Sequence, residues 1–144
     1  MEDRMTKTDL FTQSWLEGFL ARHDGAAGTV HVRRPDALHL VASSAIPESV
    51  VRATQTIPIG KGMAGLAWQR ERPIQTCNLH DDTTGDVRPG AKAVNAQAAI
   101  ALPVFNHDGE VRAVVGIAWM HSNALDRETI VRLTQDASVA PYVE

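Results

Sequence analysis

Hydrophobic residues recur with the period of an amphipathic helix near both ends of the chain. Close to the N-terminus, Phe11, Trp15 and Phe19 are spaced four residues apart, which predicts a helix over about residues 8–22. A second helix is predicted over about residues 126–138, where one face carries Ile130, Leu133, Thr134 and Ala137. Both segments begin with residue types that commonly cap helices, Thr or Asp.

Between these helices, short apolar or alternating runs bounded by turn residues predict strands. The expected strands cover residues 29–33, 38–43, 56–59, 74–77, 98–105 and 111–120. The last two have the strongest pattern, and Asn106 to Gly109 has the composition of a hairpin turn. Short helices are expected over residues 46–54 and 63–70. Pro103 has no N–H for a sheet ladder, so we expect it at a bulge or on an unpaired side of its strand.

The segment before the second short helix contains the pattern Gly-x-Gly-x-x-Gly, at Gly60, Gly62 and Gly65. This pattern occurs in dinucleotide-binding turns, where it follows a well-formed parallel strand and precedes further βαβ units. Here the preceding strand is short and contains Pro58, and Pro73 ends the helix before a polar segment and a hairpin. These surroundings argue against a dinucleotide site.

The order of these motifs resembles that of the GAF domain, a small-molecule sensor fold of signalling proteins. The resemblance spans about residues 8–139 and rests on four motifs: Gly60-Lys61-Gly62-Met63-Ala64-Gly65, Glu71-Arg72-Pro73-Ile74, Ala101-Leu102-Pro103-Val104, and Gly109 followed by Val114-Val115-Gly116. It implies an α+β fold in which a central antiparallel sheet of five to six strands is flanked by helices, with residues 1–144 forming a single domain. Flanking helices often pair two subunits in this family, so the resemblance also implies a homodimer.

The composition narrows the functional classes. A chain of 144 residues with 44% hydrophobic residues has room for one domain with a sizeable core. The formal net charge is -3, with 17 acidic residues against 14 Lys and Arg, which predicts no nucleic-acid binding. We find no run of about 18 apolar residues and no signal-like apolar region at the start, so we expect a cytoplasmic protein without a membrane partner.

The helix that begins near Met63 offers a candidate ligand site. The free N–H groups in the first turn of a helix carry partial positive charge and bind anions. One GAF type, a cytoplasmic nitrate receptor that modulates a sensor kinase, holds its anion on backbone amides at a helix start, and Leu66 and Ala67 look similar to the Leu-Ala pair that does this. The alternative is that the glycines only form a tight turn.

The expected ligand contacts are Gly65, Leu66, Ala67, Trp68, Arg88 and Pro89. Arg88 and Pro89 belong to the long connection over residues 78–97, and long connections in compact domains are usually functional or mobile. Arg88 is able to hold a planar oxyanion with two parallel hydrogen bonds. Trp68 and Trp119 are candidates for an apolar pocket wall, although core packing is the more common role of such residues.

No catalytic residue, metal or cofactor is expected. The GAF family includes free methionine-(R)-sulfoxide reductases, which need several cysteines, and one of these stands where this chain has Met63-Ala64. Cys77 is the single cysteine of the chain, and one thiol cannot both attack the sulfoxide and resolve the intermediate. His80, Asp81 and Asp82 resemble one corner of a metal site, but no pair in the chain has a zinc-type spacing.

The sequence therefore predicts a non-enzymatic sensor that binds a small molecule or a small anion such as nitrate. Its expected protein partner is a signalling protein such as a sensor kinase. Two alternatives stay open. One is a dimerising interaction module with a vestigial pocket, and the other is an enzyme like the methionine sulfoxide reductases.

Overall fold

The computed structural model describes residues 7–76, 96–121 and 125–141 of the chain. The helices are α1 (Lys7–Arg22), α2 (Glu48–Ala53), α3 (Gly62–Arg70) and α5 (Arg127–Ala137). The strands are β1 (Ala27–Arg33), β2 (Leu38–Ser44), β3 (Thr56–Ile57), β4 (Ile74–Thr76), β5 (Ala98–Phe105) and β6 (Val111–Trp119).

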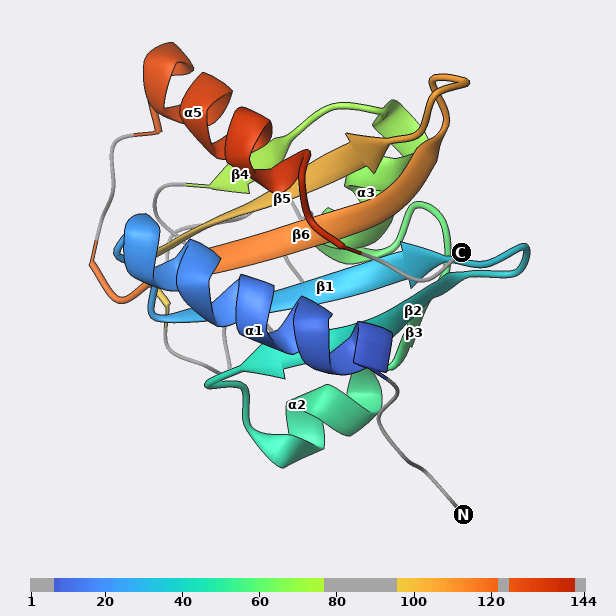
Figure 1. Ribbon diagram of the computed structural model, residues 1–144, viewed down its shortest axis with the longest axis horizontal. Coiled ribbons are helices and arrows are strands. Elements are labelled where there is room, and N and C mark those ends of the chain that lie inside the picture. The colour runs from blue at the N-terminus through green and yellow to red at the C-terminus, as the bar shows by residue number, and fades with distance from the viewer. Residues whose placement is uncertain (1–6, 77–95, 122–124, 142–144) are drawn as a thin grey trace.

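The strands form one antiparallel sheet in the order β3-β2-β1-β6-β5-β4. In Figure 1, α1 and α5 cover the near face of this sheet, and α3 lies behind it. The predicted α+β class and the antiparallel sheet of five to six strands flanked by helices are confirmed. Every strand pair in the described part of the chain is antiparallel, so the sheet is not that of a dinucleotide-binding fold.

The face of the sheet under α1 and α5 carries the large side chains of the three middle strands. These residues are Val30 of β1, Ile100 and Leu102 of β5, and Val115, Ile117 and Trp119 of β6. They pack in one cluster with Leu16 and Phe19 of α1 and with Leu133 of α5. Fully burying a side chain of this size contributes about 1.5–3 kcal/mol, so this cluster is a major source of the stability of the fold.

One carboxylate fastens the end of α1 to α5. Asp136 accepts hydrogen bonds from Arg22 Nε at 2.8 Å and Nη2 at 3.0 Å, and it lies 2.8 Å from His23 Nε2. The hydrogen bond from Arg22 is the main reason why the pKa of Asp136 is lowered. Beside this pair, the buried Trp119 donates its indole N–H to the His23 carbonyl at 2.9 Å. The two terminal helices are therefore tied to each other and to the sheet.

The backbone conformation or packing at each position of the Gly-x-Gly-x-x-Gly segment explains why glycine occurs there. Gly60 and Gly62 have φ angles of 82° and 64°, a left-handed region that favours glycine. A Cβ atom on Gly65 would lie 2.6 Å from Pro58 O and 3.1 Å from Gly60 N. The Gly60 N–H also donates to Gly65 O at 2.9 Å, which closes the turn. The tight-turn interpretation is therefore enough to explain the motif.

The predicted elements agree with the observed ones, apart from their ends. The third strand covers two residues rather than four, because Pro58 cannot continue its ladder. Pairing with β4 reaches only Ala101, so Pro103 has no partner on that side, and a register shift follows between Val104 and Phe105. None of the described helices is long and apolar enough to cross a bilayer.

The close approach at Gly65 predicts a large effect from one added methyl group. Gly65→Ala places Cβ against backbone atoms that cannot rotate away, so we expect the free energy of unfolding to fall by about 1–3 kcal/mol. Urea unfolding of the purified variant measures this loss.

Gly18→Ala is the matched control, because Gly18 lies within α1 and its added Cβ would meet a side-chain atom, Arg22 Nη1 at 3.1 Å, and not the backbone. Replacing a helical glycine by alanine should stabilise by up to about 1 kcal/mol. A Gly65→Ala protein as stable as the wild type would contradict the packing role of Gly65.

Candidate functional site

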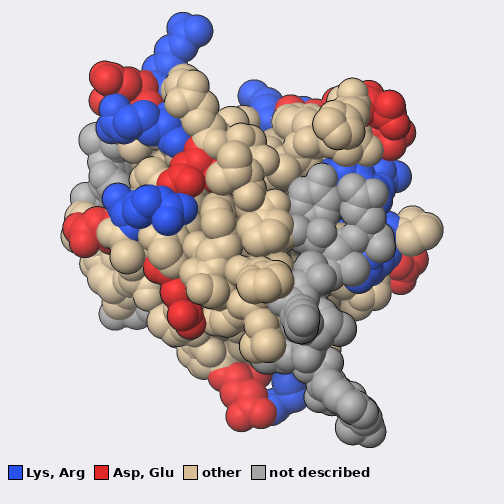
Figure 2. Space-filling model, viewed as in Figure 1, with Lys and Arg blue, Asp and Glu red and all other residues tan. Residues whose placement is uncertain are grey.

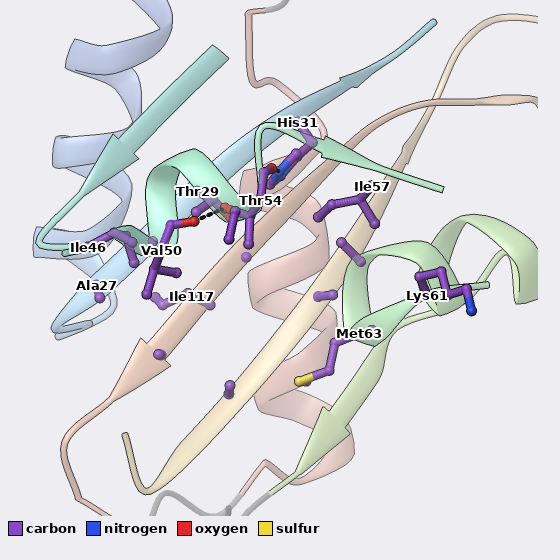
Figure 3. A pocket seen from close by; sticks show the side chains of 18 of the residues that line it. Ala27, Thr29, His31, Ile46, Val50, Thr54, Ile57, Lys61, Met63 and Ile117 are labelled. Atoms are coloured by element: carbon purple, nitrogen blue, oxygen red, sulfur yellow. Dashed lines mark hydrogen bonds between the residues drawn. The ribbon is translucent and has the colours of Figure 1, made fainter. Parts of the chain in front are cut away.

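A cavity of about 560 Å³ lies on the face of the sheet opposite α1 and α5. Figure 3 shows its walls, with α2 and the α2–β3 connection on one side and the start of α3 on the other. The cavity-lining residues used below are Thr29, His31, Ile46, Val50, Ala53, Thr54, Lys61, Met63, Ala99, Ala101, Gly116 and Ala118. Pockets for small organic ligands commonly measure about 300–1,000 Å³, so the cavity has a suitable size.

The side chains on the floor of the cavity are small, so they leave the space above the sheet unfilled. Two rows of paired residues cross the strands in the order β1, β6, β5: Ala27, Ala118, Ala99 and Thr29, Gly116, Ala101. Successive residues of a strand face opposite sides of a sheet, so these small residues alternate with the large ones that pack under α1 and α5. The cavity exists because this face of the sheet lacks the large side chains that fill the face under α1 and α5.

Helix α2 forms a wall without contributing to the core. None of its residues is buried, although Val50 and Ala53 line the cavity. The segment that leads into α2 contains Ala45, whose φ of 60° is unusual for a residue with a side chain. After α2, the chain returns to the sheet through Thr54, whose carbonyl accepts a hydrogen bond from His31 Nε2 at 2.8 Å. The far end of this wall is therefore held by a polar contact.

His31 is the buried polar side chain of the cavity. It is 2% exposed, and its Nδ1 has no hydrogen-bond partner among the described residues. Burial lowers the pKa of His31 to about 4, which outweighs the opposite effect of the hydrogen bond to Thr54. The ring is therefore neutral at physiological pH, with the proton on Nε2 where the Thr54 carbonyl accepts it.

The described lining of the cavity brings little charge to its interior. Lys61 is the lining residue with a permanent charge, and its side chain points away from the other labelled side chains in Figure 3. His31 is neutral, and the floor is made of Ala, Gly and Thr. An ionised group placed deep in such a cavity loses hydration without gaining a counter-ion from these residues.

The start of α3 is the polar part of the cavity rim. Gly62, Met63 and Ala64 all line the cavity, and α3 begins at Gly62. The first N–H of this segment that bonds within the helix belongs to Gly65, which donates to Lys61 O at 3.0 Å. The amides of Met63 and Ala64 therefore lie at the positive end of the helix, next to the cavity.

The predicted contacts on α3 lie one turn beyond this rim. Gly65, Leu66 and Ala67 are buried, and Leu66 and Ala67 pack against the sheet, while Trp68 lies under the guanidinium of Arg33 at 5.7 Å. None of these four residues lines the cavity. From the sequence, we predicted that the helix starts near Met63 and that the amides of Leu66 and Ala67 bind the ligand. In the structure, those amides fall within the helical hydrogen-bonding pattern.

Other candidate residues are placed as follows. Arg88 and Pro89 lie outside the described residues, as do Cys77 and the group His80, Asp81 and Asp82. Trp119 is 1% exposed and packs under α1 and α5, so the idea that it lines the pocket is wrong. In the part of the chain that the structure describes, no three His, Cys, Asp or Glu side chains converge as metal ligands.

Sequence reasoning missed Thr29, His31 and the small residues of the floor. A signal was present, because small residues occupy alternate positions of the two strongest strands, at Ala99, Ala101, Gly116 and Ala118. A strand that buries large residues on one side and small residues on the other has unequal faces. Thr29 and His31 have the same parity in β1 and point to the same side.

The buried, neutral state of His31 predicts a pH dependence of stability. Its folded-state pKa of about 4 lies below the value of 6.5 in an unfolded chain, so the unfolded state takes up the proton first as pH falls. The stability linked to His31 is complete above about pH 6.5 and is lost as pH falls towards about pH 4. From about pH 7 to pH 5, this loss should be about 2 kcal/mol.

The measurement is urea unfolding at both pH values for the wild type and for His31→Gln, which cannot titrate. The difference between pH 7 and pH 5 should be smaller in the variant by about 2 kcal/mol. Among the described residues, the carboxylates with lowered pKa values are those of Asp36, Asp126 and Asp136, which titrate at lower pH and are present in both proteins. The same pH dependence in both proteins would show that His31 is not buried in the neutral form.

Comparison with known proteins agrees with this fold. The chain is similar to a type II free methionine-R-sulfoxide reductase from Thermoplasma acidophilum, with 15% identity, coverage of 94% of this chain and 93% of that one, and a TM-score of 0.70. It is also similar to the reductase from Neisseria meningitidis in complex with its substrate, with 15% identity, coverage of 96% and 78%, and a TM-score of 0.74.

A third similar structure is the GAF domain of a phosphoenolpyruvate-protein phosphotransferase from Coxiella burnetii, with 15% identity, coverage of 91% and 80%, and a TM-score of 0.69. Identities at this level establish a shared fold. Comparison by sequence with curated proteins gives no match. The sequence profile of the GAF domain matches residues 12–140, which is most of the chain. The chain therefore belongs to the GAF domain family.

Proposed function

We propose that the protein is a non-enzymatic sensor that binds a small, uncharged and largely apolar organic molecule in the cavity. The observation that carries this proposal is the floor of Ala, Gly and Thr side chains, which leaves about 560 Å³ between the sheet, α2 and α3. Small-molecule sites are mostly apolar, with a few polar groups that fix the orientation of the ligand. Here the described polar groups include the side chains of Thr29, the neutral His31, Ser49, Thr54 and Thr56, and the amides at the start of α3.

A small oxyanion such as nitrate is the second candidate ligand. Its support is the pair of amides of Met63 and Ala64 at the start of α3, beside the cation Lys61. Such a helix start favours an anion. An ion of this size fills only a small part of the cavity, and the described floor gives it no counter-charge. We therefore rank this candidate below an organic ligand.

The case against an enzyme rests on the cysteine count. The chain is similar in fold to methionine sulfoxide reductases, but it has one cysteine, Cys77, where that chemistry needs an attacking and a resolving thiol. The similar structures also include a domain of a putative two-component sensor histidine kinase from Sinorhizobium meliloti, with a TM-score of 0.69 and 11% identity. A role in signalling agrees with this second kind of relative.

The proposed route to a partner is the layer of terminal helices. Leu10 and Phe11 of α1 are 53% and 64% exposed, and Val131 of α5 is 45% exposed. Contiguous patches of exposed apolar side chains mark sites of protein association, so these residues are our candidate contacts. We place a signalling protein or a second copy of the chain on this layer, in the cytoplasm. A dimerising module with an unused cavity is the alternative that the following experiment tests.

Filling the cavity should abolish ligand binding and leave the fold intact. Ala118→Leu adds bulk on the cavity side of β6, where Ala118 is only partly buried. We expect saturable fluorescence enhancement of the uncharged probe N-phenyl-1-naphthylamine with the wild type and at least about tenfold weaker binding with the variant. The affinity is measured by fluorescence titration.

Gln135→Leu is the matched control, because it adds the same apolar side chain at an exposed position of α5, far from the cavity. It should bind the probe as the wild type does. No saturable binding to the wild type, or equal binding to the Ala118→Leu protein, would favour the interaction module. Candidate natural ligands are then ranked by how well they displace the probe.

The anion candidate has its own test. Met63→Pro removes one amide N–H in the first turn of α3, where proline is tolerated, and Met63→Ala is the control that keeps the amide. If nitrate binds at the helix start, it should raise the melting temperature of the wild type and of Met63→Ala, but not that of Met63→Pro. No shift with nitrate in the wild type would remove the anion candidate.

A further inference from the structure

The floor of the cavity holds a polar side chain, Thr29, among small apolar ones. Thr29 belongs to the row that continues across β6 and β5 with Gly116 and Ala101. Its side chain is half-buried and lines the cavity. The Thr29 hydroxyl has no hydrogen-bond partner among the described residues. The floor therefore offers a hydroxyl that is free to bind a ligand.

The glycine next to Thr29 makes room for this hydroxyl. A Cβ atom on Gly116 would lie only 2.9 Å from Thr29 Oγ1, closer than such atoms normally approach. A glycine inside a strand weakens the strand and often marks a place where another group comes close to the backbone. Here the close group is the hydroxyl of the neighbouring strand. The hydroxyl is therefore directed across the floor towards β6.

The other polar side chains of the described lining are engaged, inaccessible or exposed. The Thr54 hydroxyl donates to a backbone carbonyl of α2 at 2.8 Å, and the Thr54 carbonyl accepts from His31. Nδ1 of His31 is buried, so a ligand cannot reach it unless the ring moves. Ser49 and Thr56 are exposed, and water can satisfy them. Among these groups, the Thr29 hydroxyl is the one that a ligand on the floor can reach.

A hydroxyl in this position distinguishes between ligands by their hydrogen bonding. A threonine hydroxyl has a proton to donate, and β1 is paired on both sides, with β2 and with β6. The backbone carbonyls of these three strands thus serve the sheet. A wholly apolar ligand that covers Thr29 would remove water from the hydroxyl and leave its proton without an acceptor, which costs free energy. A ligand with an oxygen at this point would accept the proton and avoid that cost.

Granted the function proposed above, on which this inference rests, we propose that the cavity selects apolar molecules that carry an uncharged oxygen acceptor, such as alcohols and ketones. The Thr29 hydroxyl donates a hydrogen bond to this oxygen above Gly116. The apolar body lies on the alanines of the floor, between Val50 on the α2 wall and Met63 at the start of α3 (Figure 3). Thr29 thereby determines the specificity of the site.

The test compares three compounds that share one bicyclic body: naphthalene, 1-naphthol and 1-acetylnaphthalene. Their affinities for the whole protein are measured by equilibrium dialysis, for the wild type and for Thr29→Val, which removes the hydroxyl at nearly constant size. The variant should bind the two oxygen-bearing compounds about three- to tenfold more weakly, because a neutral hydrogen bond is lost. Its affinity for naphthalene should be no weaker than that of the wild type.

Two further variants make the comparison specific. Thr29→Ser keeps a hydroxyl, so it should bind the oxygen-bearing compounds more tightly than Thr29→Val does. Thr134→Val makes the same change at a half-buried position of α5, outside the described lining of the cavity, and should bind all three compounds as the wild type does. Naphthalene bound by Thr29→Val shows that the cavity of the variant is still formed.

The possible failures can be told apart. Equal affinities of the wild type and Thr29→Val for the oxygen-bearing compounds, with naphthalene bound by both, would overturn the role of Thr29 and leave the proposed function standing. Equal weakening of all three compounds would show an effect of packing and would also overturn it. Weakening of 1-naphthol alone would mean that Thr29 accepts a hydrogen bond and does not donate one. No saturable binding of any compound to the wild type would contradict the proposed function itself.

Discussion

The unequal size of the side chains on the two faces of the sheet is the constraint on which this structure depends. Large residues of β1, β5 and β6 pack under α1 and α5 and supply the core. The alternate residues are so small that the same three strands leave a hollow on their other face. A β-strand fixes this division, because its side chains point to opposite sides in turn. The stability of the core and the space of the cavity therefore come from the same strands without competing for the same positions.

The fold was predictable from the sequence. For the site, the sequence predicted the region at the start of α3 but not the residues that line the floor of the cavity. Helical spacing in α1 and α5 and the strong patterns of β5 and β6 are local signals, and antiparallel pairing followed from the hairpin turn at Asn106. The cavity depends on which residues of distant strands become neighbours. The row Ala27, Ala118 and Ala99 joins three strands, and no local pattern shows that these alanines lie side by side.

The glycine segment shows why a motif with a known meaning can mislead. Gly60 and Gly62 meet backbone demands, and Gly65 lets α3 approach the preceding turn. The helix start was expected near the cavity, and it is there, but the amides at the rim belong to residues earlier in α3 than Leu66 and Ala67. The position of the glycine motif in the sequence identified the region of the helix start. Only the hydrogen bond from Gly65 to Lys61 locates the first helical turn.

The wall formed by α2 has a consequence for how easily the cavity can open. Because no residue of α2 is buried, moving it aside exposes little apolar surface and leaves the core under α1 and α5 intact. Segments of this kind open locally with far less free energy than global unfolding requires. Under the proposed function, a molecule would enter and leave the cavity through local opening at α2 and not through global unfolding. A stable core under α1 and α5 would then not hinder exchange of the proposed ligand.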